Sequence, residues 1–389
     1  MPDPLEHIDR IRHRPAMYLG LLGSGGLHVL LDEVVGLCLE GATRGATSQI
    51  DVTLHADGSL SVADDGPGLP AGGTPDGEPV GLAYSCTHRG DATLLPAGWV
   101  AARMGHLFVC ANALAEWFEA EVRRADGCER QRFERGYPVA TPPNLLSDGP
   151  RTRGSYFRWL PDREIFPDAA CEPYILRNRL RTHALLASPV RLTLTDERAG
   201  SHQEFQFDRG VADFVEVLNI GFRPSHSPIR IEHHAGWGEL SAAIQYYTRG
   251  AMAGRKPWEL LSFVNHNITT HGTHRDAVRG ALGVVLNRHA REIGLNPPTE
   301  PNLKTEYFLF DATAVVSVRM AAPRYEGAYR QHLGCPELFH DMEAAIRRVI
   351  EASLASDPRV QGVFTGAVRR ATWQREEDRR KHPTKSLLK

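Results

Sequence analysis

The chain has few cysteines and no long hydrophobic run. Its six cysteines are scattered without a CxxC pair, which indicates buried or free thiols in a reducing compartment rather than a disulfide framework or a cysteine metal site. No apolar stretch approaches the roughly 20 residues of a membrane span, and no basic segment followed by an apolar one opens the chain. These absences predict a cytoplasmic protein that does not enter a membrane.

Neither sign of charge dominates the chain. Lysine and arginine total 45 against 47 aspartates and glutamates, so the net charge of −2 gives no general bias toward nucleic acid or membrane. The length of 389 residues allows two domains with full cores. Residues 369–389 do hold eight Lys or Arg against three Asp or Glu. A solvated helix and tail accounts for this excess, and a nucleic-acid contact is the alternative.

The most informative stretch runs from 62 to 70, where two adjacent aspartates enter a glycine-rich turn. Apolar and polar residues alternate over 50–54 and again over 60–62, which predicts a β-hairpin that delivers this turn. Asp64 and Asp65 point to opposite faces of a strand, so one can face a pocket while the other faces solvent or a cap. The glycines let the backbone approach a ligand closely. On this stretch alone, a plain Asp-Gly surface turn is the alternative.

Further motifs surround this turn in a definite order. Upstream lie His-Arg-Pro-Ala-Met-Tyr-Leu-Gly at 13–20 and Gly-Gly-Leu-His at 25–28, and downstream lie Arg-Gly-Ser-Tyr-Phe at 153–157 and Gly-Thr-His at 272–274. In order and spacing these motifs resemble the N-terminal ATPase region of the gyrase B and topoisomerase IV ParE subunits, within the GHKL superfamily. Matching segments run almost from end to end of the chain.

The resemblance implies an α+β fold with three parts. Residues 1–212 would form the GHKL, or Bergerat, ATPase sandwich, residues 213–368 a transducer domain with a ribosomal-protein-like fold, and residues 369–389 a basic C-terminal helix or tail. Periodicity predicts helices at 27–42, 100–114, 273–294 and 342–353, a strand pair within 118–134, and strands at 151–158, 190–195, 204–208, 242–247, 260–264 and 314–319.

The resemblance also implies a binding site for the adenine of ATP or ADP. Asp64 matches the family's adenine-reading aspartate, because a carboxylate accepts a hydrogen bond from the exocyclic amine. Ser155 stands where the family usually has a threonine that completes a water-mediated contact. Gly66 and Gly68 match the glycines beneath the base, and Arg124 falls near a family arginine that flanks it. This adenine side is the best-preserved part of the expected site.

The phosphate side departs from the family pattern. Glu33 matches the general base that activates the attacking water. Leu37 lies one helical turn further on the same face and replaces the magnesium-binding Asn, and leucine offers a hard cation no oxygen ligand. The sequence therefore argues against Mg²⁺ and assigns no metal ligand. Only Gly105 survives from the glycine-rich lid motif, Pro67 replaces an arginine beside the base, and Arg330 stands at the transducer loop whose lysine touches the γ-phosphate.

Because these losses cluster, they predict a degenerate ATPase: a stand-alone, gyrase-B-like ATP-clamp module that acts as a regulatory or interaction protein, linked to gyrase subunits or DNA. Two alternatives stay open, a slow ATPase that still uses Glu33 and an ATP-independent DNA-binding protein. Few residues precede the motif at 13–20, where the family has a subunit-wrapping arm, so we expect a weak or nucleotide-dependent homodimer. In gyrase B a metal-binding TOPRIM domain follows this region, and we find no acidic D-x-D cluster in this sequence that would supply it.

Overall fold

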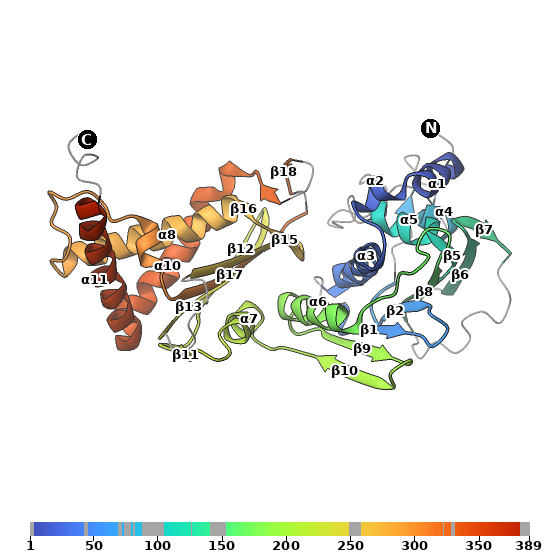
Figure 1. The fold of residues 1–389 in the computed structure, drawn as a ribbon, viewed down its shortest axis with the longest axis horizontal. Helices are drawn as coiled ribbons and strands as arrows, with labels where there is room; N and C mark the ends of the chain where they lie inside the picture. The colour runs from blue at the N-terminus through green and yellow to red at the C-terminus, as the bar shows by residue number, and fades with distance from the viewer. Residues whose placement is uncertain are drawn as a thin grey trace. The chain divides into compact units, whose positions relative to one another are not determined.

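The computed structural model describes residues 4–42, 46–68, 72–73, 79–80, 82–87, 105–125, 127–140, 153–248, 258–321, 323–327 and 331–381. The chain divides into two compact units, Met1–Gly210 and Val211–Lys389 (Figure 1). Each unit has its own sheet and its own hydrophobic core. Residues 71–100, which the resemblance matches to the family's lid over the nucleotide, lie almost entirely outside the described residues.

The first unit is built on an eight-stranded sheet with the order β10-β9-β1-β2-β8-β5-β6-β7. Its strands are β1 (Gln49–Leu54), β2 (Leu60–Asp64), β5 (Ala115–Arg124), β6 (Gly127–Glu134), β7 (Tyr137–Val139), β8 (Gly154–Pro161), β9 (Arg191–Asp196) and β10 (Ser201–Phe205). Neighbouring strands are antiparallel except β1 and β9. The β1–β2 pairing confirms the predicted hairpin. A short β3 (Gly72–Gly73) to β4 (Pro79–Val80) ladder is separate.

Helices cover one face of this sheet (Figure 1). They are α1 (Pro4–His13), α2 (Pro15–Leu19), α3 (Ser24–Ala42), α4 (Leu82–Thr87), α5 (Gly105–Ala113) and α6 (Pro173–Leu186). Strand alternation directs Val62, Phe118 and Phe157 toward the helices, where all three are fully buried. Phe108 of α5 meets Phe118 and Phe157 edge-on, with ring centroids 5.8 and 5.1 Å apart. This core fixes α5 against the centre of the sheet.

The second unit contains a six-stranded sheet. The strands are β11 (Arg223–Pro224), β12 (Ile229–Ala235), β13 (Gly238–Thr248), β14 (Trp258–Val264), β15 (Asn267–Thr269) and β17 (Ala312–Arg319). The strands β11-β13-β17-β14-β15 are hydrogen-bonded in this order, and β12 also pairs with β13. β14 and β17 are parallel neighbours, and the chain between them contains a long helix. A three-stranded sheet joins β16 (His271–Gly272), β18 (Tyr325–Glu326) and β19 (His332–Leu333).

Helices flank both faces of the second sheet. They are α7 (Val211–Leu218), α8 (Thr273–Glu292), α9 (Thr305–Phe308), α10 (Phe339–Ser356) and α11 (Pro358–Lys381), with a 3-10 turn at Pro336–Leu338. Along β17, Val316 points into the core shared with α8 and α10. On the other face, Phe214 of α7 lies 5.6 Å from Phe263 of β14, ring centroid to centroid. A sheet covered by helices in each unit confirms the predicted α+β class.

The C-terminal basic residues lie on a longer helix than the sequence suggests. α11 begins at Pro358, so the division predicted between 368 and 369 falls inside it. Its first half packs into the core through Val360, Phe364 and Val368. Arg379 near its end donates to Glu300 Oε2 at 2.6 Å. None of the helices that the structure describes combines the length and the apolar character needed to cross a membrane.

Candidate functional site

The two adjacent aspartates at the end of β2 have different environments. Asp65 caps the start of β1: its Oδ1 accepts hydrogen bonds from the backbone N–H groups of Ser48 at 2.8 Å and Gln49 at 3.0 Å, and its Oδ2 accepts from the Ser48 hydroxyl. Asp64 shares the helix-covered face with Val62, two residues earlier. It is only 4% exposed, and its Oδ1 accepts from the backbone N–H of Gly66 at 2.7 Å.

Strand register brings Ser155 beside Asp64. Ala63 of β2 pairs with Tyr156 of β8, so the next residues along, Asp64 and Ser155, are cross-strand neighbours on the helix-covered face. On the other side of β8, Ser155 pairs with Val122 of β5. Ser155 is 5% exposed. The arrangement groups a carboxylate, a hydroxyl and an apolar side chain, while a water-bridged contact between Asp64 and Ser155 stays a prediction.

The turn after Asp64 requires glycine. A Cβ at Gly66 would lie 2.3 Å from Thr47 Oγ1 and 2.7 Å from Asp64 Oδ1. Gly68 has a φ of +78°, and a Cβ there would lie 2.6 Å from Val122 Cγ1. Side chains at these positions would fill the space in front of Asp64 or collide with β5. The two glycines therefore hold the turn directly against the strands that carry Asp64 and Val122.

Arg124 also lies beside this turn. Its Cγ is 3.5 Å from the position that a Cβ on Gly68 would occupy, and its guanidinium forms an ion pair with Glu129 at 3.5 Å. Pro67, between the two glycines, is exposed. The structure thus gathers Asp64, Gly66, Gly68, Ser155 and Arg124 around the ends of β2, β8 and β5. We call these five residues the adenine end.

Two further residues, which were not predicted as site residues, contact the adenine end. Arg153 holds the turn in place, since its Nε donates to Gly66 O at 3.1 Å and its Nη2 donates to Ala46 O at 3.0 Å. Its position two residues before the predicted site residue Ser155 is the sequence signal that could have identified it. Thr47 has a fully buried hydroxyl, without a hydrogen-bond partner among the described residues, beside Gly66. No motif in the sequence marks Thr47.

The predicted phosphate side comes from α3 and α5. Glu33 is partly exposed on α3. Burial raises the pKa of the Cys110 thiol on α5 to about 12, and the negative charge of Glu33 adds to this shift, so the Glu33 carboxylate lies within electrostatic range of α5. Leu37 is only 6% exposed and belongs to the hydrophobic core of the first unit. One turn of α3 therefore presents a carboxylate and the next presents a packed apolar side chain.

The remaining predicted residues are placed less fully. Gly105 is the first residue of α5, and the residues 101–104 before it lie outside the described residues, as does Arg330. We call Glu33, Leu37 and Gly105 the phosphate end. Among the described residues, no three His, Cys, Asp or Glu side chains gather to hold a metal ion. That Glu33, Asp64, Gly66 and Ser155 line one concavity also stays a prediction.

Sequence comparisons find relatives along most of the chain. Residues 210–384 match the family model described as DNA gyrase B. The chain is 32% identical over 398 residues to the DNA gyrase B subunit of Thermus thermophilus, a match that covers 98% of this chain and 61% of the relative. It is 32% identical over 340 residues to the DNA topoisomerase 4 B subunit of Streptococcus pneumoniae, a match that covers 85% of this chain and 51% of the relative. The chain thus spans about half to three-fifths of these relatives.

Solved structures show the same fold. The 43K ATPase domain of Thermus thermophilus gyrase B, solved in complex with an aminocoumarin, matches with a TM-score of 0.77 and 29% identity over 97% of both chains. The B subunit of the DNA gyrase from Myxococcus xanthus matches with a TM-score of 0.75 and 22% identity, over 92% of this chain and 99% of that one. The second likeness concerns the fold alone.

Proposed function

This chain resembles the ATPase and transducer region of the gyrase B and topoisomerase IV ParE subunits and has their GHKL-type fold, and from that premise we propose that it is a degenerate ATPase. It binds ATP or ADP through the adenine end and hydrolyses ATP weakly or not at all. Its role is that of a cytoplasmic regulatory or interaction protein toward gyrase subunits or DNA.

Nucleotide binding is supported by the chemistry of the adenine end. Asp64 is buried, and its Oδ1 accepts a hydrogen bond from the backbone N–H of Gly66. A carboxylate is an acceptor at both oxygens, which is the chemistry that an exocyclic amine requires. Gly68 keeps the turn tight against β5, and Ser155 supplies a hydroxyl on the neighbouring strand. These features suit a flat base that carries a hydrogen-bond donor.

The burial of Leu37 is the observation that best supports the proposed loss of ATP hydrolysis. It occupies the turn of α3 after Glu33 and is packed into the core at 6% exposure. A hard cation needs oxygen ligands, and this turn supplies none. Without magnesium, the triphosphate would keep its negative charge near Glu33, and that repulsion weakens ATP more than adenosine. The proposal therefore predicts that each added phosphate contributes little or nothing to affinity.

Calorimetric titration tests this proposal. The full chain is titrated with adenosine, ADP, ATP and a non-hydrolysable ATP analogue, each with and without magnesium. We expect all four to bind, with magnesium changing the affinity for ATP by less than about threefold, which is under 1 kcal/mol. Magnesium-dependent tightening of ATP by about a hundredfold would contradict the proposed degeneracy. Failure of all four ligands to bind would contradict nucleotide binding itself.

Glu33 favours a second candidate, a slow ATPase. Its carboxylate sits on a long helix, within electrostatic range of α5, the helix that Gly105 opens. A rigidly held carboxylate can accept the proton of an attacking water. Phosphate release that requires magnesium and disappears in Glu33→Ala, with adenosine affinity unchanged, would establish this candidate. Phosphate release at the level of a protein-free control would leave the degenerate ATPase.

The role toward gyrase or DNA rests on the likeness alone. A chain that shares the fold of gyrase B could pair with a second copy of itself or meet the partners of its relatives, and we propose that nucleotide promotes such pairing. Sedimentation with and without the non-hydrolysable analogue measures this directly. A steep fall of DNA affinity with added salt, unaffected by nucleotide, would instead support the ATP-independent DNA-binding alternative.

A further inference from the structure

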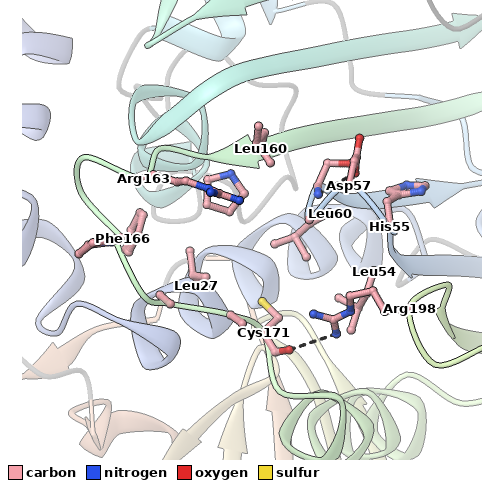
Figure 2. Close-up of a pocket in the computed structure, with 16 residues that line it drawn as sticks. Leu27, Leu54, His55, Asp57, Leu60, Leu160, Arg163, Phe166, Cys171 and Arg198 are labelled. Atoms are coloured by element: carbon pink, nitrogen blue, oxygen red, sulfur yellow. Dashed lines mark hydrogen bonds between the residues drawn. The ribbon is translucent and has the colours of Figure 1, made fainter.

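A pocket lies in the first unit, at the end of the hairpin away from Asp64. It has a volume of about 320 Å³ and lies beneath the β1–β2 turn and the segment from Pro161 to Cys171 (Figure 2). The strand β2 separates the two places: Leu60 at its start lines this pocket, and Asp64 at its end belongs to the adenine end. None of the five adenine-end residues lines the pocket. The volume falls within the range of small-ligand sites.

The pocket has an apolar floor. Leu27 of α3, Leu60 of β2 and Phe166 are at most 4% exposed and line it together. Leu160 at the end of β8 is partly exposed and completes the apolar side. In Figure 2 these leucines surround one space, with Arg163 and Arg198 on opposite sides. The residues come from elements that the core already fixes, so the shape of the pocket is set by the fold.

Most charged groups at the pocket are already neutralised. Asp57 accepts from Arg158 Nη2 at 2.8 Å. Arg198 donates to both oxygens of Asp196, at 2.9 Å from Nε to Oδ1 and 3.1 Å from Nη2 to Oδ2, and its Nη2 also donates to Cys171 O at 3.4 Å. Each of these charges is therefore balanced by a fixed neighbour of opposite sign.

His55 adds no positive charge at neutral pH. Burial lowers its pKa below the ordinary value of 6.5, and the nearby Arg158 lowers it further. Its Nε2 contacts Ser61 Oγ at 2.8 Å and its Nδ1 contacts Glu197 Oε1 at 3.0 Å. Glu197 also accepts from the backbone N–H of Ala56 at 3.0 Å and is not part of the lining. Both ring nitrogens are engaged, so the imidazole is a fixed polar wall.

Arg163 is the exception. It lines the pocket and is exposed, and no hydrogen bond or ion pair joins it to another residue in the part of the chain that the structure describes. Once the balanced pairs are set aside, the lining keeps one positive charge, carried by a guanidinium beside an apolar cavity. A guanidinium matches a planar carboxylate with two parallel hydrogen bonds.

We propose that this pocket binds a small monocarboxylate with an apolar body, whose carboxylate pairs with Arg163 and whose body fills the space between Leu27, Leu60 and Leu160. A single negative charge matches the single unbalanced positive charge. A phosphate dianion is the poorer match, because its second negative charge would find no further unbalanced positive group among these lining residues. The pocket is independent of the proposed nucleotide site.

Calorimetry with 4-phenylbutyrate as the probe tests the inference, with 4-phenylbutanol as its uncharged counterpart. The wild-type full chain should bind the acid about tenfold more tightly than the alcohol, since one charge-assisted hydrogen-bonded pair contributes roughly this factor. In Arg163→Gln the acid should weaken by about tenfold and the alcohol should not change. Arg181→Gln, on the exposed side of α6, is the matched control and should leave both ligands unaffected.

Two further measurements locate the bound acid. Methyl NMR signals of Leu60 and Leu160 should shift on titration with 4-phenylbutyrate, and Asp64→Asn should leave the affinity for the acid unchanged. The inference is overturned if no heat and no methyl shift appear at millimolar acid, if Arg163→Gln binds the acid as well as the wild type does, or if Asp64→Asn abolishes binding. A chain that fails to bind any nucleotide but passes these tests would refute the proposed function and leave this pocket intact.

Discussion

The adenine end and the phosphate end of the candidate site are built in different ways. At the adenine end, the register of β2, β8 and β5 places the functional groups, and glycines are required because a Cβ would strike a strand. At the phosphate end, helix faces present the side chains. An apolar side chain on such a helix can join the core, and Leu37 does so. The fold itself therefore protects the adenine end and tolerates change at the phosphate end.

The strongest test of this difference replaces Gly154 at the start of β8. Its φ is +118°, and an added Cβ would lie 1.9 Å from the carbonyl oxygen of Asp64. Gly154→Ala should lower the free energy of unfolding by about 4 kcal/mol, because backbone strain and a backbone collision act together. Urea unfolding of the first unit measures the change. Under conditions in which Gly154→Ala remains folded, it should also lose adenosine binding.

Gly58→Ala is the matched control for this change. Gly58 also has a positive φ, +88°, but the nearest atom to an added Cβ is Leu160 Cδ1 at 3.9 Å. Only the strain of the left-handed backbone remains, so the cost should be about 1 kcal/mol. Equal costs for the two variants would mean that the contact between β8 and Asp64 is looser than the structure shows.

The next largest effect is expected at the phosphate end. Leu37→Asn restores the residue type expected of a magnesium ligand, but it places an amide in an apolar core. We expect the free energy of unfolding to fall by about 3 kcal/mol, from lost packing and an unsatisfied polar group. Phosphate release should stay at background. Leu37→Met, which keeps the volume, should cost less than about 1.5 kcal/mol. A catalytic gain in Leu37→Asn would show that this one residue is what suppresses hydrolysis.

The two aspartates of β2 separate binding from stability. Asp64→Asn should weaken adenosine about 30-fold, close to 2 kcal/mol, because a charged acceptor is lost while Asn can still accept from Gly66. Asp65→Asn removes a charged cap from Ser48 and Gln49, so it should lower stability by about 1 kcal/mol and change adenosine affinity less than about twofold. Reversed results would move the nucleotide contact from Asp64 to Asp65.

Local patterns predicted much of the fold. The alternation over 50–62 is enough to predict β1 and β2, because one face of that hairpin is buried and the period of two is strict. The helix predicted from 27 begins three residues earlier, at Ser24, since glycines at 25 and 26 hide the apolar stripe there. The C-terminal part was harder. Arginines from 369 onward suggested a separate basic helix or tail, and the structure places the first of them on α11, whose earlier apolar residues lie in the core.

The site could be predicted only in part. The glycine-rich turn after two aspartates stood out by its local pattern, but the roles of Asp64, Gly66, Gly68 and Ser155 came from the resemblance to gyrase B. The roles of Arg153 and Thr47 depend on tertiary contacts to a turn more than 80 and nearly 20 residues away in sequence, respectively, which no local pattern reveals. The pocket beside Arg163 was also beyond sequence reasoning, since its walls come from α3, β2, β8 and the segment after β8.

The smallest effect is expected at Ser155, and it tests how closely the adenine end follows its expected chemistry. Ser155 is buried beside Asp64 and Val122, so its hydroxyl has few partners to choose from. Ser155→Ala should weaken adenosine about fivefold, equivalent to about 1 kcal/mol, because one water-mediated or direct hydrogen bond is lost. Ser155→Thr keeps the hydroxyl and adds a methyl group, and should change affinity by less than about threefold. If Ser155→Ala binds adenosine as tightly as the wild type does, while Asp64→Asn binds it more weakly, then the base contacts the Asp64 carboxylate without help from β8.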